Sequence, residues 1–244
     1  MGGASRASGD YRTMMSPRVG IDHKIRWADL ELVYQQWLAG MEISPTTLIP
    51  QWQHVRGLAA RKKAATIMTR LWNQKRWQEG SSRSLLSETL RLHRLLGYWG
   101  LFVGTYPFYQ ETANTAGRLL AVQEGFTTRQ LYQRMAGVYD DSERTRVGVK
   151  MILGSWVDWR LLERVKVGHY RMASRMTVDE PVEIAFLTHV ALRTSHQERL
   201  IWHDIAQFPW LFPFDVVMSR RSQMKEFGLS LEQNGARELM VGER

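Results

Sequence analysis

The sequence predicts a mainly α protein, in which a helical bundle is followed by a smaller helical unit and short β-hairpins. Apolar residues recur at helical spacing in most segments of the 244-residue chain, and the breaks between these segments are short. Strand-like alternation is confined to two stretches, residues 161–178 and 229–241. A hydrophobic content of 44%, with ten Trp, is sufficient for a sizeable core.

The positions of turn-forming and helix-breaking residues along the chain predict four parts. They are a flexible tail over residues 1–20, a helical domain with a basic helix over 21–106, a second helical unit over 107–178, and C-terminal helices with a terminal β-hairpin over 179–244. The tail has no apolar segment typical of a signal peptide, and the most apolar stretch, residues 95–108, is too short to cross a bilayer. We therefore expect a cytoplasmic protein that has no membrane partner.

The first helical domain begins with a helix over residues 25–39. Ser44 and Pro45 are typical of a helix cap and a first helical position. A basic helix is expected within residues 56–76. After a break at residues 80–82, a leucine-rich helix is expected to start at Ser84 and to end near Pro107.

The net charge of +9 and the basic pI predict a polyanionic partner. Between Ile43 and Gln78 the chain contains seven Lys or Arg and no acidic residue. A solvated helix face normally mixes charges of both signs, so this face is expected to bind phosphate rather than only solvent. Its candidate phosphate ligands are Arg56, Arg61, Lys62, Lys63 and Arg70. Trp52 and Trp77 are open to base stacking, whereas Trp72 lies on the apolar stripe and is expected in the core.

Residues 107–178 contain three short helical patterns and then a basic, alternating segment. The helices are expected over 112–123, 129–139 and 143–159, and Gly168 marks the turn of a hairpin. Thr127 or Thr128 is the expected cap of the second helix and Ser142 that of the third, whose buried stripe is expected to run from Thr145 to Trp159. Three short helices followed by a basic hairpin are the layout of a winged helix-turn-helix, whose third helix enters the major groove of DNA. The candidate contacts are Arg144, Arg146 and Lys150 on the third helix, and Arg164, Lys166, His169, Arg171 and Arg175 on the hairpin.

The C-terminal part is expected to contain a helix over residues 181–192 and another over 195–206. Asn234 and Gly235 predict the turn of a terminal hairpin. No Gly-rich phosphate loop ending in GK[ST], no GxSxG, no GxGxxG after a strand and no HExxH is present. The chain has no Cys, and its histidines are scattered. We therefore expect no enzyme activity, cofactor or metal site.

Several segments resemble a known family. They are ARKKAATIMTRLW, LHRLLGYWGLFVGTYPFYQETA, FTTRQLYQRM and LGSWVDWRLLE, which follow one another between about residues 55 and 165. This order is similar to the BrxA family of the BREX phage-resistance systems, small helical DNA-binding proteins with a winged-helix unit. The chain departs from that family from Asp179 onward, and a related component of another phage-defence island fits as well. The resemblance implies duplex DNA as a partner, together with other proteins of a bacterial defence complex.

Three functions follow as hypotheses. The first is a DNA-binding accessory protein with two basic surfaces, residues 56–76 and the winged-helix unit. The second is a structural subunit of an RNA-guided or other ribonucleoprotein complex that contacts only the backbone. The third is a winged-helix module that binds proteins. Binding to duplex DNA, single-stranded DNA and RNA over a salt series distinguishes them.

Overall fold

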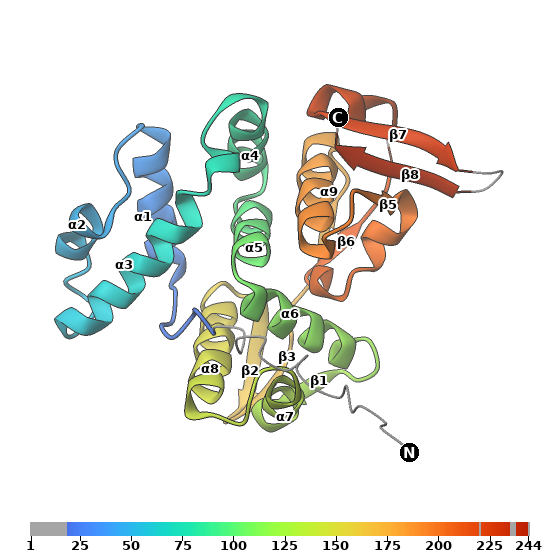
Figure 1. The fold of residues 1–244 in the computed structure, drawn as a ribbon. Coiled ribbons are helices and arrows are strands. Elements are labelled where there is room, and N and C mark those ends of the chain that lie inside the picture. The colour runs from blue at the N-terminus through green and yellow to red at the C-terminus, as the bar shows by residue number, and fades with distance from the viewer. Residues whose placement is uncertain (1–18, 220, 235–237, 244) are drawn as a thin grey trace, which may run out of the picture.

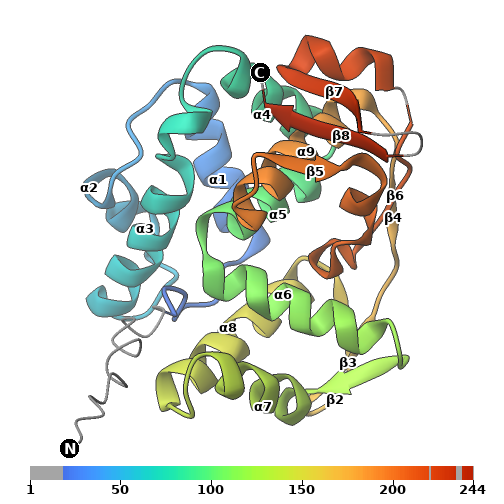
Figure 2. The ribbon, with the colours of Figure 1, turned by 45° about the vertical axis from the view of Figure 1, so that its right-hand side comes forward.

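The computed structural model describes residues 19–219, 221–234 and 238–243, and it is mainly helical, as the sequence predicted. Figure 1 shows the N-terminal helices on one side of a central helix, α5 (Arg94–Thr105), and the C-terminal helix and strands on the other. A smaller group of helices and strands lies beneath them, and the turned view in Figure 2 shows the same arrangement. Residues 1–18 of the predicted tail lie outside the described residues, whereas Val19 is buried.

The N-terminal helices follow the sequence prediction closely. They are α1 (Trp27–Leu38), α2 (Pro45–Leu48) and α3 (Leu58–Trp72), with 3-10 turns η1 (Ile49–Gln51) and η2 (Lys75–Trp77) between or after them. Ser44 caps α2 as predicted, because its hydroxyl accepts a hydrogen bond from the backbone N–H of Thr47 at 3.3 Å. The apolar stripe of α3 is buried from Ala64 to Trp72.

The long helix predicted from Ser84 to Pro107 is instead two helices, α4 (Gly80–Leu92) and α5. The predicted break at residues 80–82 is also wrong, since these residues form the first turn of α4. The true break is His93, whose φ of −141° and ψ of 82° are not helical. Its Nδ1 lies 3.2 Å from Oε1 of Glu183, and its Nε2 lies 3.5 Å from the sulfur of Met176. These distant partners hold His93 outside a helical conformation.

The smaller group of elements corresponds to residues 107–172. It contains α6 (Pro107–Leu120), β1 (Gly125–Thr127), α7 (Thr128–Val138), α8 (Glu143–Asp158), β2 (Leu162–Lys166) and β3 (His169–Met172). The strands form an antiparallel sheet in the order β1-β3-β2. The hairpin between β2 and β3 was predicted, and its Gly168 has the positive φ, 73°, that favours glycine in a turn. The sequence did not indicate β1, and α6 begins earlier than predicted because Pro107 takes its first position.

The C-terminal part contains one long helix, short strands and 3-10 turns. They are β4 (Met176–Val178), α9 (Pro181–Ser195), β5 (Arg199–Ile201), η3 (Trp202–Gln207), η4 (Pro209–Leu211), β6 (Phe214–Val216), η5 (Arg221–Phe227), β7 (Leu229–Asn234) and β8 (Glu238–Glu243). Strand β4 pairs in parallel with β6, while β5, β8 and β7 form an antiparallel sheet in the order β5-β8-β7. The terminal hairpin is confirmed by the pairing of Asn234 with Glu238, and residues 235–237 lie outside the described residues.

The helix predicted over residues 195–206 is wrong. His196, at the end of α9, has a left-handed φ of 54° and ends the helix. The chain then forms β5, which pairs with β8 some forty residues later in the sequence. Because this pairing is a long-range contact, the local apolar spacing of the segment did not reveal it.

An aromatic cluster around Trp99 on α5 joins the parts of the molecule. Its ring centroid lies 5.5 Å from that of Trp156 on α8 and 5.4 Å from that of Phe212, which follows η4. Its indole N–H donates to the carbonyl oxygen of Trp210 at 3.0 Å. Such packed aromatic pairs contribute to stability beyond the burial of their area. One core therefore crosses the boundaries that we expected after residues 106 and 178.

His189 on α9 makes the fold sensitive to acid. Burial lowers its pKa to about 4, and the charge of Arg76 acts in the same direction. Its hydrogen bond to the carbonyl of Phe227 opposes the shift. The carboxylate of Glu243, 3.0 Å from Nδ1, is half exposed and is also paired with Arg76. Since the folded state disfavours the proton, stability is full above the unfolded pKa of about 6.5 and decreases as the pH falls toward 4.

We expect the free energy of unfolding to decrease by up to about 3 kcal/mol between pH 6.5 and 4 because of this residue. Urea unfolding at several pH values measures the decrease, with His189→Gln as the comparison. The variant should lose that part of the pH dependence. An identical pH dependence in both proteins would show that His189 does not cause it.

Candidate nucleic-acid interface

Capping residues fix where α7 and α8 begin. The Thr127 hydroxyl accepts a hydrogen bond from the backbone N–H of Gln130 at 3.1 Å, and the Gln130 side chain accepts one from the backbone N–H of Thr127. Ser142 caps α8 in the same way, accepting from the N–H of Thr145 at 3.2 Å. The predicted caps are thus confirmed, and they set which face of each helix is exposed.

The predicted buried stripe, from Thr145 to Trp159 just after α8, packs into the core. Arg144, Arg146 and Lys150 therefore point to the exposed side of the helix, as expected. Hydrogen bonds from Ser142 and Thr145, followed by the positive charge of Arg144, lower the pKa of Asp140 at the start of α8.

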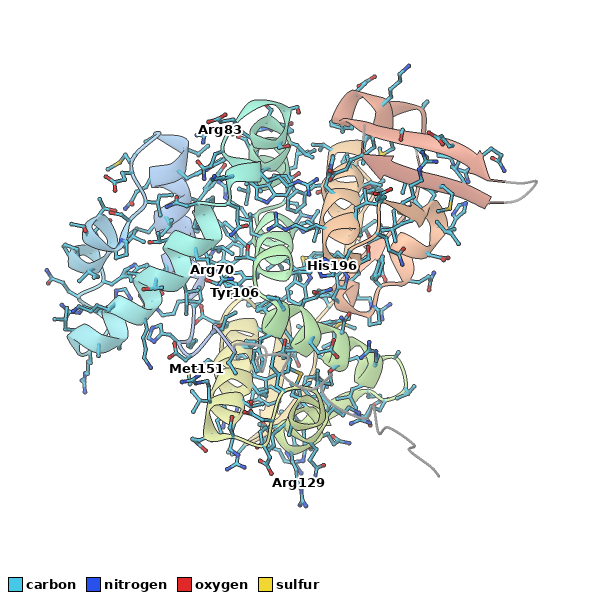
Figure 3. The ribbon with its side chains drawn as sticks, in the orientation of Figure 1. Arg70, Arg83, Tyr106, Arg129, Met151 and His196 are labelled. Carbon is cyan, nitrogen blue, oxygen red and sulfur yellow. The ribbon has the colours of Figure 1, made fainter. Side chains whose placement is uncertain are left out.

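A groove of about 480 Å³ lies between α7 and α8. It is lined by Thr128, Arg129, Tyr132, Gln133, Asp141, Arg146 and Lys150. The sequence analysis missed the residues from α7, although Thr127 as N-cap together with buried Leu131 and Met135 fixes their exposed positions. Figure 3 shows Arg129 at the outer edge of this unit, pointing away from the body of the molecule.

Arg146 is held by neighbours on both helices. Its guanidinium carbon lies 4.7 Å from the ring centroid of Tyr132, and Nη2 donates to the Tyr132 hydroxyl at 3.2 Å. Its guanidinium also pairs with Asp141 at 3.4 Å and with Glu143 at 3.5 Å. The hydrogen bond to Tyr132 raises the pKa of Arg146. The side chain is therefore oriented in advance, at the mouth of the groove.

The β2–β3 hairpin is attached to the start of α7. The carbonyl oxygen of Gly168 accepts a hydrogen bond from the backbone N–H of Thr128 at 2.9 Å. Lys166, His169 and Arg171 line a pocket of about 320 Å³ beside Thr127. The turn of the hairpin is thus fixed next to the α7–α8 groove, and the hairpin and α8 belong to one unit.

The cations of the hairpin differ in their partners. Arg171 pairs with Glu163 at 2.6 Å, and Arg175 pairs with Asp215 at 3.1 Å. By contrast Arg164 and Lys166, like Lys150 on α8, are exposed, and within the described part of the chain none of the three forms an ion pair. These three cations therefore remain available to an external anion, as does Arg144 on α8, which is exposed and forms no ion pair within the described residues.

The basic face of α3 is less isolated than predicted. Lys63 pairs with Asp22 at 2.7 Å, an acid from outside the acid-free segment. Arg61 donates to the carbonyl oxygens of Val55 at 2.8 Å and of Gln53 at 3.2 Å. The prediction of an uncompensated face is therefore wrong for Lys63, because an acid from another segment pairs with it. Arg61 has no acidic partner among the described residues, but backbone carbonyls of its own segment occupy its guanidinium.

Three of the five candidate phosphate ligands of this segment, Arg56, Lys62 and Arg70, are exposed and form no ion pair within the described residues. The guanidinium of Arg70 lies 5.3 Å from the ring centroid of Tyr106, and Figure 3 shows the two side by side. The aromatic contribution predicted for this surface is absent, since Trp52 and Trp77 are buried together with Trp72. These indoles are not available for base stacking.

No group of three or more His, Asp or Glu side chains in the described part is arranged to hold a metal ion. Within the same residues, no helix combines the length and apolar character needed to cross a membrane. Comparison with known proteins adds no relative, since no protein-family model, curated protein or solved structure matches the chain.

Proposed function

We propose that residues 107–178 are a winged helix-turn-helix unit that binds duplex DNA. In this proposal α8 enters the major groove, and the β2–β3 hairpin follows the adjacent phosphate backbone. The order α6-β1-α7-α8-β2-β3, with the sheet order β1-β3-β2, supports this arrangement. A major groove about 12 Å wide admits one α-helix, and the exposed side of α8 is the side with the cations.

The observation that supports DNA most directly is the set of cations without a carboxylate partner. Lys150, Arg164 and Lys166 lie on the two elements that contact DNA in this arrangement. Unpaired surface cations gain most from a polyanion, because binding releases the counterions of the phosphates. We assign these three to phosphates.

Arg146 is the proposed base-reading residue. Its stacking on Tyr132 fixes the direction of a guanidinium whose two parallel donors match the edge of guanine. Arg129 and Gln133, on the α7 side of the groove, are proposed to contact the backbone that flanks the major groove.

The exposed side of α3 is the second proposed DNA surface, through Arg56, Lys62 and Arg70. The wider setting follows from the resemblance to BrxA alone. On that basis the protein is proposed to be a cytoplasmic, non-enzymatic accessory component of a bacterial defence complex.

Binding of the full chain to labelled duplex DNA, single-stranded DNA and RNA tests the proposal. We expect duplex DNA to bind most tightly, and log affinity to fall linearly with log salt by about 0.9 per neutralised phosphate. Fluorescence anisotropy between about 50 and 200 mM salt measures both quantities. A preference for RNA or single strands would favour the ribonucleoprotein subunit instead. Absence of binding at low salt would favour the protein-interaction module.

A further inference from the structure

A second charged pocket lies far from the α7–α8 groove in the sequence, at the C-terminal end of α9. Its volume is about 460 Å³, within the range of about 300–1,000 Å³ that is usual for small-ligand sites. It is lined by three arginines, Arg76, Arg193 and Arg199, by Gln197, and by two carboxylates, Glu198 and Glu243. Figure 3 labels His196, the left-handed residue after which the chain turns away from α9 toward β5.

Arg76 is the most deeply placed of these cations. Its side chain is 22% exposed, and its Nη2 lies 2.8 Å from Nδ1 of His189. The other ring nitrogen of His189 lies 2.9 Å from the carbonyl oxygen of Phe227, which can only accept, so Nε2 must donate. In the neutral imidazole Nδ1 then has a lone pair, and Arg76 donates to it. His189 thus orients Arg76 without neutralising its charge.

A second positive charge lies close to Arg76. Burial, followed by the charge of Arg193, lowers the pKa of Arg76. Arg193 donates to the neutral side chain of Gln74 at 3.0 Å, and within the described residues it forms no ion pair. Arg199 is paired with Glu232 outside the pocket. The guanidiniums of Arg76 and Arg193 therefore both line the pocket. Among the described residues Arg76 is paired with Glu243, whereas Arg193 has no carboxylate partner.

The carboxylate of Glu243 is an incomplete partner. It pairs with Arg76, but its Oε1 also lies 3.0 Å from Nδ1 of His189. While the imidazole is neutral, both of these atoms are hydrogen-bond acceptors, so they do not bond to each other. The side chain of Glu243 is 47% exposed and belongs to the last residue of β8, the central strand of its sheet. Glu243 thus occupies the anion-binding position beside Arg76. An external anion with more acceptor atoms can take that position in its place.

We propose that this pocket binds a phosphate monoester through Arg76 and Arg193, and that the ligand displaces the carboxylate of Glu243. Arginine forks match the oxygens of a phosphate in pairs, and a dianionic monoester has three terminal acceptors for the two guanidiniums and for the amide of Gln197. The phosphate belongs either to a free nucleotide or to the 5′ end of a strand. The pocket and the α7–α8 groove share no residue, so phosphate binding here does not depend on duplex binding there.

Calorimetric titration of the full chain tests the pocket, at ionic strength held constant with KCl. AMP is expected to bind and adenosine is not. Arg193→Gln should weaken AMP binding about tenfold, because it removes one charge-assisted partner while leaving a side chain that can pair with Gln74. Glu243→Gln should strengthen AMP binding, because the competing carboxylate is lost. Arg118→Gln, an exposed arginine on α6 outside this pocket, is the matched control and should leave AMP binding unchanged.

Two short single strands, identical except for a 5′-phosphate or a 5′-hydroxyl, assign the source of the phosphate. Tighter binding of the phosphorylated strand than of AMP assigns the pocket to a strand end, and the reverse assigns it to a nucleotide. If neither AMP nor the phosphorylated strand binds better than its phosphate-free counterpart, the proposal is wrong. It is also wrong if Arg193→Gln and Glu243→Gln change AMP binding in the same direction. Duplex affinity measured in parallel keeps this result separate from the proposed DNA interface.

Discussion

Replacing Lys150, Arg164 and Lys166 together with alanine is expected to lower the affinity for duplex DNA about a hundredfold. Among the described residues these exposed cations have no carboxylate partner that their loss would leave unpaired, so folding should be unaffected. The slope of log affinity against log salt should decrease by about 3, close to one unit for each lost phosphate contact. Anisotropy titrations of wild type and variant over the same salt series give both values.

A second triple alanine variant, of Arg56, Lys62 and Arg70, tests the proposed α3 surface by the same measurement. A loss confined to the first variant assigns binding to the α7–α8 unit and its hairpin. Comparable losses in both variants support two DNA surfaces. If the first variant is folded, as circular dichroism can verify, and binds DNA with the salt slope of the wild type, the proposed interface is refuted.

Gly117→Ala is expected to destabilise the protein by about 3 kcal/mol. Gly117 lies on α6, where a β-carbon would be 1.9 Å from the carbonyl oxygen of Pro209 and 2.7 Å from its carbonyl carbon. Both atoms belong to the backbone of η4, so the contact cannot be relieved by rotating a side chain. The helix and the C-terminal segment would have to move apart, which would disturb the aromatic packing around Trp99 next to it.

Gly137→Ala on α7 provides the opposite case. A β-carbon there meets nothing within 4 Å, and alanine is favoured over glycine in a helix. We expect this variant to gain about 0.5–1 kcal/mol. Urea unfolding of the two variants beside the wild type measures the difference. Equal stabilities for Gly117→Ala and the wild type would mean that α6 and η4 do not pack as closely as described.

The candidate interface could be predicted only in part. The sequence placed Arg144, Arg146 and Lys150 on the exposed face of one helix, because Ser142 and the stripe ending at Trp159 fix its start and its rotation. It did not place Arg129 and Tyr132 beside them, since that depends on how α7 packs against α8. Nor did it separate the paired cations from the free ones, because partners such as Asp22 for Lys63 and Asp215 for Arg175 come from other segments.

By itself the sequence determined the features whose causes are local. Ser44, Thr127 and Ser142 cap the helices that follow them, because each side-chain oxygen needs only a backbone N–H two or three residues on. Gly168 sets the turn of the β2–β3 hairpin for a similarly local reason, a positive φ. Only the tertiary structure decided the break at His93, the strand at residues 199–201 and the pocket of Arg76, Arg193 and Glu243. Each of these depends on partners dozens of residues away, so its free energy comes from contacts that no short window of sequence contains.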